Sequence, residues 1–158
     1  MPSDRDEATR LHRAGALRIQ KGDCREAAAL IGRSLAIDPR SAEAQFHFGI
    51  AMAAQERRPE ALEALGRALA LRPDFARALS VRSGVYHALG MHAEALADID
   101  RALALDPGRA LALNNRGSIL MDMNRLPEAV ETLSRALNAD PGNGPALFNR
   151  ATALRGLQ

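Results

Sequence analysis

The four histidines, at positions 12, 47, 87 and 92, are the side chains best suited to hold a metal ion, because a neutral imidazole is a common zinc ligand. A zinc site needs about four converging ligands, and Cys24 is the only cysteine that can join them. His87 lies six residues beyond Val81, which is about 9 Å along a helix axis. The spacing therefore predicts that His12, His47 and His87 do not converge, and that His92 is exposed at a turn. We expect no metal site and no cofactor.

Other patterns that resemble catalytic motifs are also weak. Cys24 stands in a predicted turn beside Arg25, as an isolated surface thiol. Residues 142–144 read Gly-Asn-Gly, but they connect two predicted helices, whereas a phosphate-binding glycine loop follows a strand. The sequence contains neither the G-x-S-x-G pattern nor a P-loop. We therefore expect a protein that is not an enzyme.

The composition limits the classes of partner. The 158 residues are 47% hydrophobic, which predicts a folded chain, and only 3% aromatic, which favours closely packed helices. The 21 basic residues are nearly balanced by 19 acidic ones, so no strong positive field is available to gather nucleic acid. The first residues are polar and no apolar run is long enough to span a membrane. We expect a cytoplasmic protein without a nucleic-acid or membrane partner.

A period of 34 residues organises the chain. Half of the eight prolines recur at this spacing, as Pro39, Pro73, Pro107 and Pro141. Twelve residues before each of these prolines stands an alanine, and the residue before that is a glutamate: Ala27, Ala61, Ala95 and Ala129, and Glu26, Glu60, Glu94 and Glu128. A fixed period with several occupied columns predicts an array of repeats.

Each period predicts two helices. The first runs from about residue 8 to residue 21 and ends at a residue suited to a left-handed turn; the terminal column holds Gly22, Glu56, Gly90 and Asn124. The second begins near Pro59 or Pro127, where a missing N–H is harmless, and ends before the periodic proline. Gly15, Gly49 and Gly117 share one position of the first helix, facing the alanine column, so the two helices approach closely.

This 34-residue period, with its glycine and alanine columns and terminal proline, resembles the tetratricopeptide repeat (TPR) family. The resemblance implies an all-α fold, an α-solenoid wound as a right-handed superhelix of roughly four and a half helix-turn-helix repeats and roughly nine helices. We expect a single solenoid domain, with a lead-in at 1–7, repeats at 8–41, 42–75, 76–109 and 110–143, and a half repeat or capping helix at 144–158. The third repeat departs from the pattern, with Ser83 at the glycine position, and Arg82 and Arg116 replace the usual leucine before it.

The resemblance also implies that the first helices line a concave groove that binds an extended or helical peptide. The repeat register places these residues in the groove: Thr9, His12, Arg13, Ala16, Glu43, Phe46, His47, Ile50, Arg77, Ser80, Val81, Gly84, Leu111, Asn114, Asn115, Ser118, Phe148, Asn149 and Thr152. We predict a protein-binding scaffold or adaptor with a protein or peptide partner.

Three patches are expected along this groove. The first is basic, through His12 and Arg13, and suits an acidic peptide. The second is apolar, through Phe46, Ile50 and Val81. The third carries Asn115 and Asn149 at one repeat position, which is similar to the asparagine ladder of O-linked N-acetylglucosamine transferases. An ordinary solvated polar surface is the alternative for these amides.

One class of partner, the chaperone tails that some members of the family bind, can be compared with the residues of this chain. Chaperone-binding members use a carboxylate clamp of Lys, Asn, Asn, Lys and Arg. The corresponding positions here hold His12, Ala16, His47, Arg77 and Val81, of which only Arg77 has the required charge. We therefore expect no recognition of a chaperone tail.

The last predicted helix keeps an apolar side, through Leu147, Phe148, Leu154 and Leu157. A terminal repeat normally has a polar outer face. Two further interpretations follow: the chain is the recognition module of a larger enzyme such as a glycosyltransferase, or it self-associates through this helix.

Overall fold

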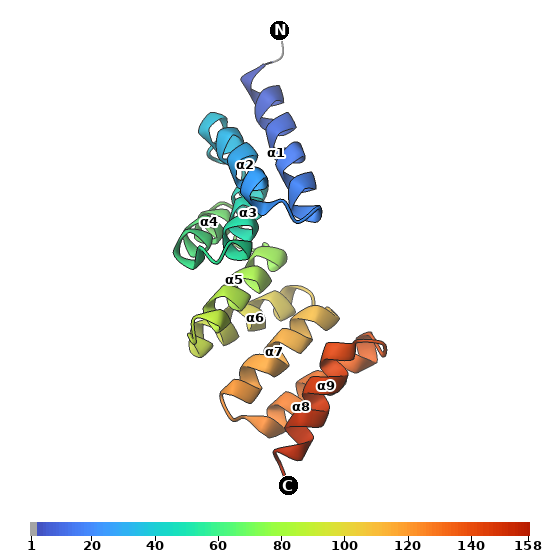
Figure 1. The fold of residues 1–158 in the computed structure, drawn as a ribbon. Helices are drawn as coiled ribbons and strands as arrows, with labels where there is room; N and C mark the ends of the chain where they lie inside the picture. The colour runs from blue at the N-terminus through green and yellow to red at the C-terminus, as the bar shows by residue number, and fades with distance from the viewer. Residues whose placement is uncertain (1–2) are drawn as a thin grey trace. The chain divides into compact units, whose positions relative to one another are not determined.

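A computed structural model describes residues 3–158, which form nine α-helices and no strand (Figure 1). The helices are α1 (Asp4–Gln20), α2 (Cys24–Ile37), α3 (Ala42–Ala54), α4 (Arg58–Leu71), α5 (Ala76–Ala88), α6 (His92–Leu105), α7 (Ala110–Asp122), α8 (Leu126–Ala139) and α9 (Gly144–Arg155). The helices α3, α5, α7 and α9 begin 34 residues apart, as do α2, α4, α6 and α8. The predicted all-α repeat fold is confirmed. Across the described residues, no helix is both long and apolar enough to cross a membrane.

The turn inside each hairpin is made by one left-handed residue. Gly22 and Gly90 have φ of 82° and 73°, and the non-glycine residues Glu56 and Asn124 have φ of 59° and 56°. All four stand in the column that the sequence predicted to end the first helix. Pro59 and Pro127 lie in the first turn of α4 and α8, where no helical hydrogen bond is lost.

The N-terminal helix begins earlier than predicted. We expected the first helix to start near Ala8, after a lead-in at residues 1–7. Residues 1–2 of this lead-in lie outside the described residues. Ser3 instead caps α1: its Oγ accepts a hydrogen bond from the Asp6 N–H, and the Ser3 N–H donates to the Asp6 carboxylate. This reciprocal capping box, with acidic residues in the first turn, adds one turn to the helix.

The chain divides into two compact units within α5, one ending at Val81 and the other beginning at Arg82. In the first unit α1 packs on α2 and α3 on α4, and in the second α8 packs on both α7 and α9. The single solenoid domain that we expected stays a prediction. In a repeat array each hairpin packs mainly on its neighbours, so compactness is local.

The glycine column sets how closely the two helices of a hairpin approach. A Cβ added at Gly49 would lie 2.7 Å from Leu65 Cγ and 3.4 Å from the Ala61 carbonyl oxygen, and one added at Gly117 would lie 2.5 Å from Leu133 Cγ. Leu65 and Leu133 are fully buried. The predicted glycine–alanine approach is therefore present, with the larger side chain one turn after the alanine as the main contact.

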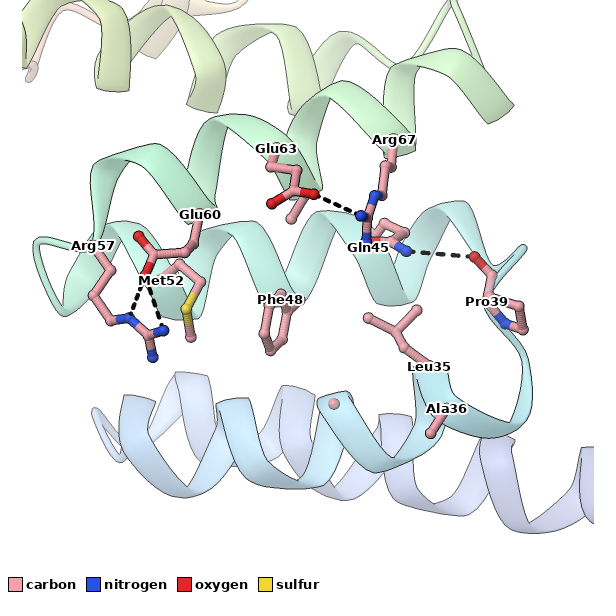
Figure 2. Close-up of a pocket in the computed structure, with 12 residues that line it drawn as sticks. Leu35, Ala36, Pro39, Gln45, Phe48, Met52, Arg57, Glu60, Glu63 and Arg67 are labelled. Atoms are coloured by element: carbon pink, nitrogen blue, oxygen red, sulfur yellow. Dashed lines mark hydrogen bonds and ion pairs between the residues drawn. The ribbon is translucent and has the colours of Figure 1, made fainter.

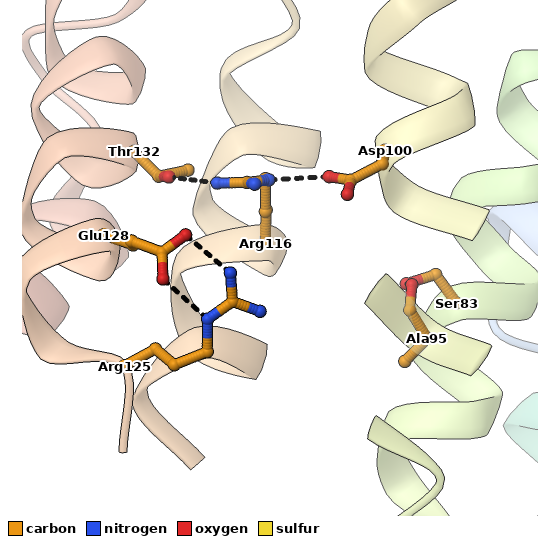
Figure 3. A network of polar contacts seen from close by, with 7 residues as sticks. All are labelled: Ser83, Ala95, Asp100, Arg116, Arg125, Glu128 and Thr132. Atoms are coloured by element: carbon orange, nitrogen blue, oxygen red, sulfur yellow. Dashed lines mark hydrogen bonds and ion pairs between the residues drawn. The ribbon is translucent and has the colours of Figure 1, made fainter. Parts of the chain in front are cut away.

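In the third repeat a serine takes the place of the glycine. Ser83 occupies the glycine position, is fully buried and donates a hydrogen bond of 2.7 Å to the Ala95 carbonyl oxygen (Figure 3). Ala95 belongs to the alanine column. The hydrogen bond satisfies a polar group that would otherwise be costly to bury.

The residue just before the glycine column differs between repeats, and the residue that lies opposite it on the second helix differs with it. In the second repeat these positions are Phe48 and Ala64, which line one cavity. In the third repeat they are Arg82 and Asp98, joined by two hydrogen bonds of 2.6 and 2.8 Å. The side chain of Asp98 is only 6% exposed and that of Arg82 19%, so this ion pair is largely withdrawn from water.

The fourth repeat has a third version of this pair. Arg116 donates to the Thr132 hydroxyl at 2.6 Å and to the Asp100 carboxylate at 2.7 Å, so it spans two neighbouring helices (Figure 3). Arginine at this position therefore finds a polar partner in both repeats, and phenylalanine finds an apolar one.

We predict opposite effects for two glycine-to-alanine changes. Gly49→Ala should destabilise the protein by about 1–3 kcal/mol, because the new methyl group overlaps Leu65. Gly66→Ala, within α4 and with no atom within 4 Å of its added Cβ, should stabilise it by about 0.5–1 kcal/mol. Urea unfolding measures both. Equal stabilisation by the two changes would contradict the close approach at Gly49.

The paired columns yield a second prediction. Asp98→Ala should lower the free energy of unfolding by about 3 kcal/mol, because Arg82 then stays half-buried without its carboxylate. Adding Arg82→Phe copies the Phe48 and Ala64 pair of the second repeat and should restore stability to within about 1 kcal/mol of the original. If the double variant unfolds as easily as Asp98→Ala alone, the two columns are not interchangeable pairs.

Candidate functional site

Successive first helices are joined by polar contacts between residues 34 or 35 positions apart. In the first unit, His12 and His47 bring two ring nitrogens to 2.8 Å, and Arg77 donates to Glu43 at 3.0 Å. In the second unit, Asn149 donates to Asn114 at 3.1 Å. We call the surface that these helices form within each unit the first-helix face. The residues that the sequence predicted for the groove all belong to first helices.

The first-helix face of the first unit carries an excess of positive charge. Glu43 accepts hydrogen bonds from both Arg72 and Arg77, at 2.8 and 3.0 Å, and Arg13 is exposed one repeat earlier. Partial burial would raise the pKa of Glu43, but the Arg72 hydrogen bond and the charges of Arg72 and Arg77 outweigh it and lower that pKa. One ionised carboxylate is therefore shared by two guanidinium groups, and Arg13 adds a further positive charge on α1.

Phe46 does not provide the accessible apolar anchor that we expected. Its side chain is only 4% exposed, and its ring lies 4.7 Å from that of Phe75. The Arg77 guanidinium lies 4.9 Å from the Phe46 ring centre, and the Arg72 guanidinium lies 3.4 Å from that of Phe75. Phe46 therefore supports the two arginines by packing and cation–π contact instead of facing solvent. Ile50, Ser80 and Val81 are half-buried.

Two amides of the second unit contact each other, since Asn149 donates to Asn114. Asn115 and Ser118 are half-buried, and the ladder of Asn115 and Asn149 toward a ligand stays a prediction. Among the described large apolar side chains, Phe148 and Leu111 are the most exposed, at 70% and 59%. The accessible apolar groups of the predicted groove are thus in the second unit.

A cavity that the sequence analysis missed lies in the first unit, among α2, α3 and α4. Its volume is about 380 Å³, and Leu35, Phe48 and Met52 supply apolar walls (Figure 2). Two ion pairs, Arg57 with Glu60 and Arg67 with Glu63, border it. The sequence signal was Phe48, which replaces the usual family leucine and reaches toward the preceding hairpin; a Cβ at Gly32 of α2 would lie 3.7 Å from its ring.

The histidines are also closer to one another than the sequence predicted. His12 and His47 form the contact described above, although the sequence predicted no convergence among the first three histidines. His92 is half-buried at the start of α6 instead of exposed in a turn, and its ring lies 5.6 Å from that of His87. The spacing placed His12, His47 and His87 on first helices, as observed, but it did not indicate the small offset between neighbouring helices.

These features define a tandem helical-repeat protein, in which hairpins of one design carry different polar contacts. A sequence profile of the tetratricopeptide repeat matches residues 18–83 and 86–153, most of the chain. The chain belongs to the tetratricopeptide repeat family. A search of curated protein sequences gave no match.

Solved structures with the same fold cover about three quarters of the chain or more. PilF of Pseudomonas aeruginosa is 24% identical, with a TM-score of 0.87 over 97% of this chain and 70% of its own. YrrB, described as a TPR protein with an unusual peptide-binding site, is 21% identical, with a TM-score of 0.76 over 92% of this chain and 75% of its own. The first TPR of Spaghetti (RPAP3), solved bound to the HSP90 peptide SRMEEVD, is 23% identical, with a TM-score of 0.73 over 76% of this chain and 95% of its own.

The histidine pair predicts a loss of stability in acid. Burial is the main cause that lowers the pKa of both His12 and His47 below the ordinary value of 6.5. The folded protein therefore binds fewer protons than the unfolded chain in the interval just below pH 6.5. The pair's contribution is complete above that pH and is lost as the pH falls from 6.5 toward the lowered values.

The second unit supplies a matched control for this prediction. Asn114 and Asn149 occupy the same repeat positions as His12 and His47, three repeats later. The double variant His12→Asn with His47→Asn should lose less stability over the same pH interval. Urea unfolding at several pH values on both sides of 6.5 measures this difference. An identical pH dependence in the variant would contradict the assignment.

Proposed function

We propose that this protein is a non-enzymatic interaction module that binds an acidic, extended segment of another protein on the first-helix face of the first unit. The observation that carries the proposal is the sharing of Glu43 by Arg72 and Arg77, with Arg13 exposed nearby in the repeat register. A carboxylate of a ligand can compete for these partly exposed guanidinium groups, which form strong, directional hydrogen bonds with carboxylates.

The geometry of the face suits an extended ligand. Phe46 and Phe75 hold Arg77 and Arg72 by their rings, so the guanidinium groups lose little additional freedom when a ligand binds. The known structures support a peptide as the ligand class, since YrrB is described with a peptide-binding site and Spaghetti was solved with a bound peptide. For the present chain this remains an analogy of fold.

The ligand that we propose is not a chaperone tail of the type recognised by a carboxylate clamp. His12 and His47 contact each other at two of the clamp positions, and Ala16 and Val81 fill two others. Neutral or apolar side chains there provide no fixed charge for a terminal carboxylate. Internal Asp or Glu side chains of an extended segment fit the arginines better.

Peptide display tests this function directly. Selection of random peptides on the purified protein should enrich acidic sequences, and a selected peptide, labelled with a fluorophore, gives the Kd by anisotropy. Arg13→Glu with Arg77→Glu should weaken that Kd by at least about tenfold, because two attractive contacts become repulsive.

The control is Arg33→Glu with Arg67→Glu, which makes the same charge change on exposed positions of the second helices α2 and α4. This control should bind the peptide nearly as well as the original protein. Enrichment of neutral or basic peptides, or an equal loss of affinity in the control, would contradict the proposal.

A second candidate function is supported by the surface of α9. Leu147, Phe148 and Leu154 are 51%, 70% and 42% exposed, and exposed apolar surface of this kind commonly contacts another domain or chain. The corresponding proposal is a recognition module of a larger enzyme, such as a glycosyltransferase like the O-linked N-acetylglucosamine transferases. Coding sequence for a catalytic domain after Gln158 would support it, and an immediate stop codon would contradict it. Concentration-dependent sedimentation would instead indicate self-association.

A further inference from the structure

Three side chains that can bind a metal ion meet in the second unit. His87 is near the end of α5, His92 is the first residue of α6 and Asp122 is the last residue of α7. One potential ligand atom from each lies within 4.8 Å of the other two. His87 Nε2 and an Asp122 carboxylate oxygen are 2.7 Å apart. The cluster therefore joins the hairpin of the third repeat to the first helix of the fourth.

We propose that His87, His92 and Asp122 form a binding site for a divalent transition-metal ion of the zinc class. Two imidazoles and one carboxylate are a typical protein ligand set for zinc and its neighbours, in which one or more positions stay open to water or another ligand. Calcium and magnesium instead prefer sites built from oxygen ligands. This site is separate from the peptide-binding proposal and goes beyond it.

The distances require only small movements of side chains. Ligand atoms in a tetrahedral zinc site are roughly 3.3 Å apart, as follows from bond lengths of about 2.0–2.1 Å. The contact between His87 and Asp122 would open slightly, and any wider separation, at most 4.8 Å, would close by about 1.5 Å or less. Asp122 is 57% exposed, which leaves its side chain room to turn and a coordination position open to solvent.

The unsatisfied nitrogen of His92 is an independent sign of a ligand. Nδ1 of His92 is shielded from solvent and makes no hydrogen bond within the described part of the chain. A buried polar atom without a partner costs about 1–3 kcal/mol, so such atoms are uncommon without a reason. A metal ion bound at Nδ1 would give this nitrogen the partner that it lacks and would fix the orientation of the ring.

The repeat pattern argues that the cluster is not a by-product of the fold. The positions equivalent to His87 hold Ile19, Ala53, Met121 and Arg155, and those equivalent to His92 hold Cys24, Arg58 and Leu126. Positions equivalent to Asp122 hold Gln20, Ala54, Ala88 and Gly156. Packing of the hairpin thus demands no imidazole or carboxylate at any of these positions. The third and fourth repeats combine all three in one place.

The local field of the helices also favours a cation. His87 and Asp122 both lie in the last turn of their helices, where the unpaired carbonyl groups give a partial negative charge. The N-terminus of α6 has the opposite sign, so two negative helix ends act against one positive end. Together with the Asp122 carboxylate, the balance attracts a divalent ion.

The test uses the full chain, treated with a chelator and then titrated with zinc chloride alone. We expect one zinc ion per chain by isothermal titration calorimetry, with a Kd in the micromolar range. At a zinc concentration of about one hundred times the Kd, the Tm should rise by roughly 5–10 °C. Cobalt(II) provides a second readout, because a four-coordinate ion absorbs visible light far more strongly than the hydrated ion.

The variants take residues that the repeat already uses at the same positions. His87→Met copies Met121, His92→Leu copies Leu126 and Asp122→Ala copies Ala88, so each variant is expected to fold. The combination of His87→Met with His92→Leu should weaken zinc binding by at least about 100-fold, since even second-shell changes cost 10–100-fold. His12→Asn with His47→Asn removes the other two histidines and should leave zinc binding unchanged.

Several results would overturn the site. The first is the absence of binding heat and of a thermal shift in the original protein, which would leave His87 and Asp122 as an ordinary ion pair. The second is zinc binding that survives the changes at His87 and His92 and disappears with those at His12 and His47. A stoichiometry well above one ion per chain would show unspecific surface binding and would also count against it.

Discussion

The close approach of two helices within each hairpin is the constraint on which the rest of the structure depends. At Gly15, Gly49 and Gly117 there is no room for a methyl group, because a large side chain of the second helix fills that space. This contact fixes the axial register of the hairpin, since a slip in either helix would bring a side chain into the gap. The exception at Ser83 keeps the same register through its hydrogen bond to Ala95.

A fixed register turns a sequence period into a spatial one within each unit. Residues 34 or 35 positions apart meet on successive first helices, whatever their chemistry. The same pair of positions is an imidazole pair at His12 and His47 and an amide pair at Asn114 and Asn149. The pair across the hairpin is likewise apolar at Phe48 and Ala64 and ionic at Arg82 and Asp98. The backbone frame is therefore conserved within the molecule while the side chains that it presents are exchanged.

This separation of frame and side chains explains how one small fold carries two unrelated candidate sites. In the first unit, buried aromatic rings hold two arginines at the surface, and a single glutamate leaves them partly unsatisfied. In the second unit, the ends of three helices gather two histidines and an aspartate. Neither arrangement is needed for the hairpin to pack, because other repeats hold different residues at the equivalent positions, such as Ser80 at that of Phe46 and Leu126 at that of His92. Residues that can bind a ligand therefore occupy positions at which the stability of the fold does not fix the residue type.

The sequence by itself determined the period, the ends of the helices and the family, because each of these depends on local chemistry. The periodic prolines end the second helices, glycine or asparagine favours the left-handed turn after a first helix, and small residues at a fixed spacing predict a close approach. The tertiary structure alone decided which side chains meet. Spacing placed Asn115 and Asn149 at one repeat position, but it did not indicate that the shift between neighbouring helices brings Asn114 to Asn149. The tertiary structure also decided that Arg77 covers Phe46 and that His92 lies beside His87. Spacing along the sequence gives neither a shift of one residue between neighbouring helices nor the direction in which a long side chain points.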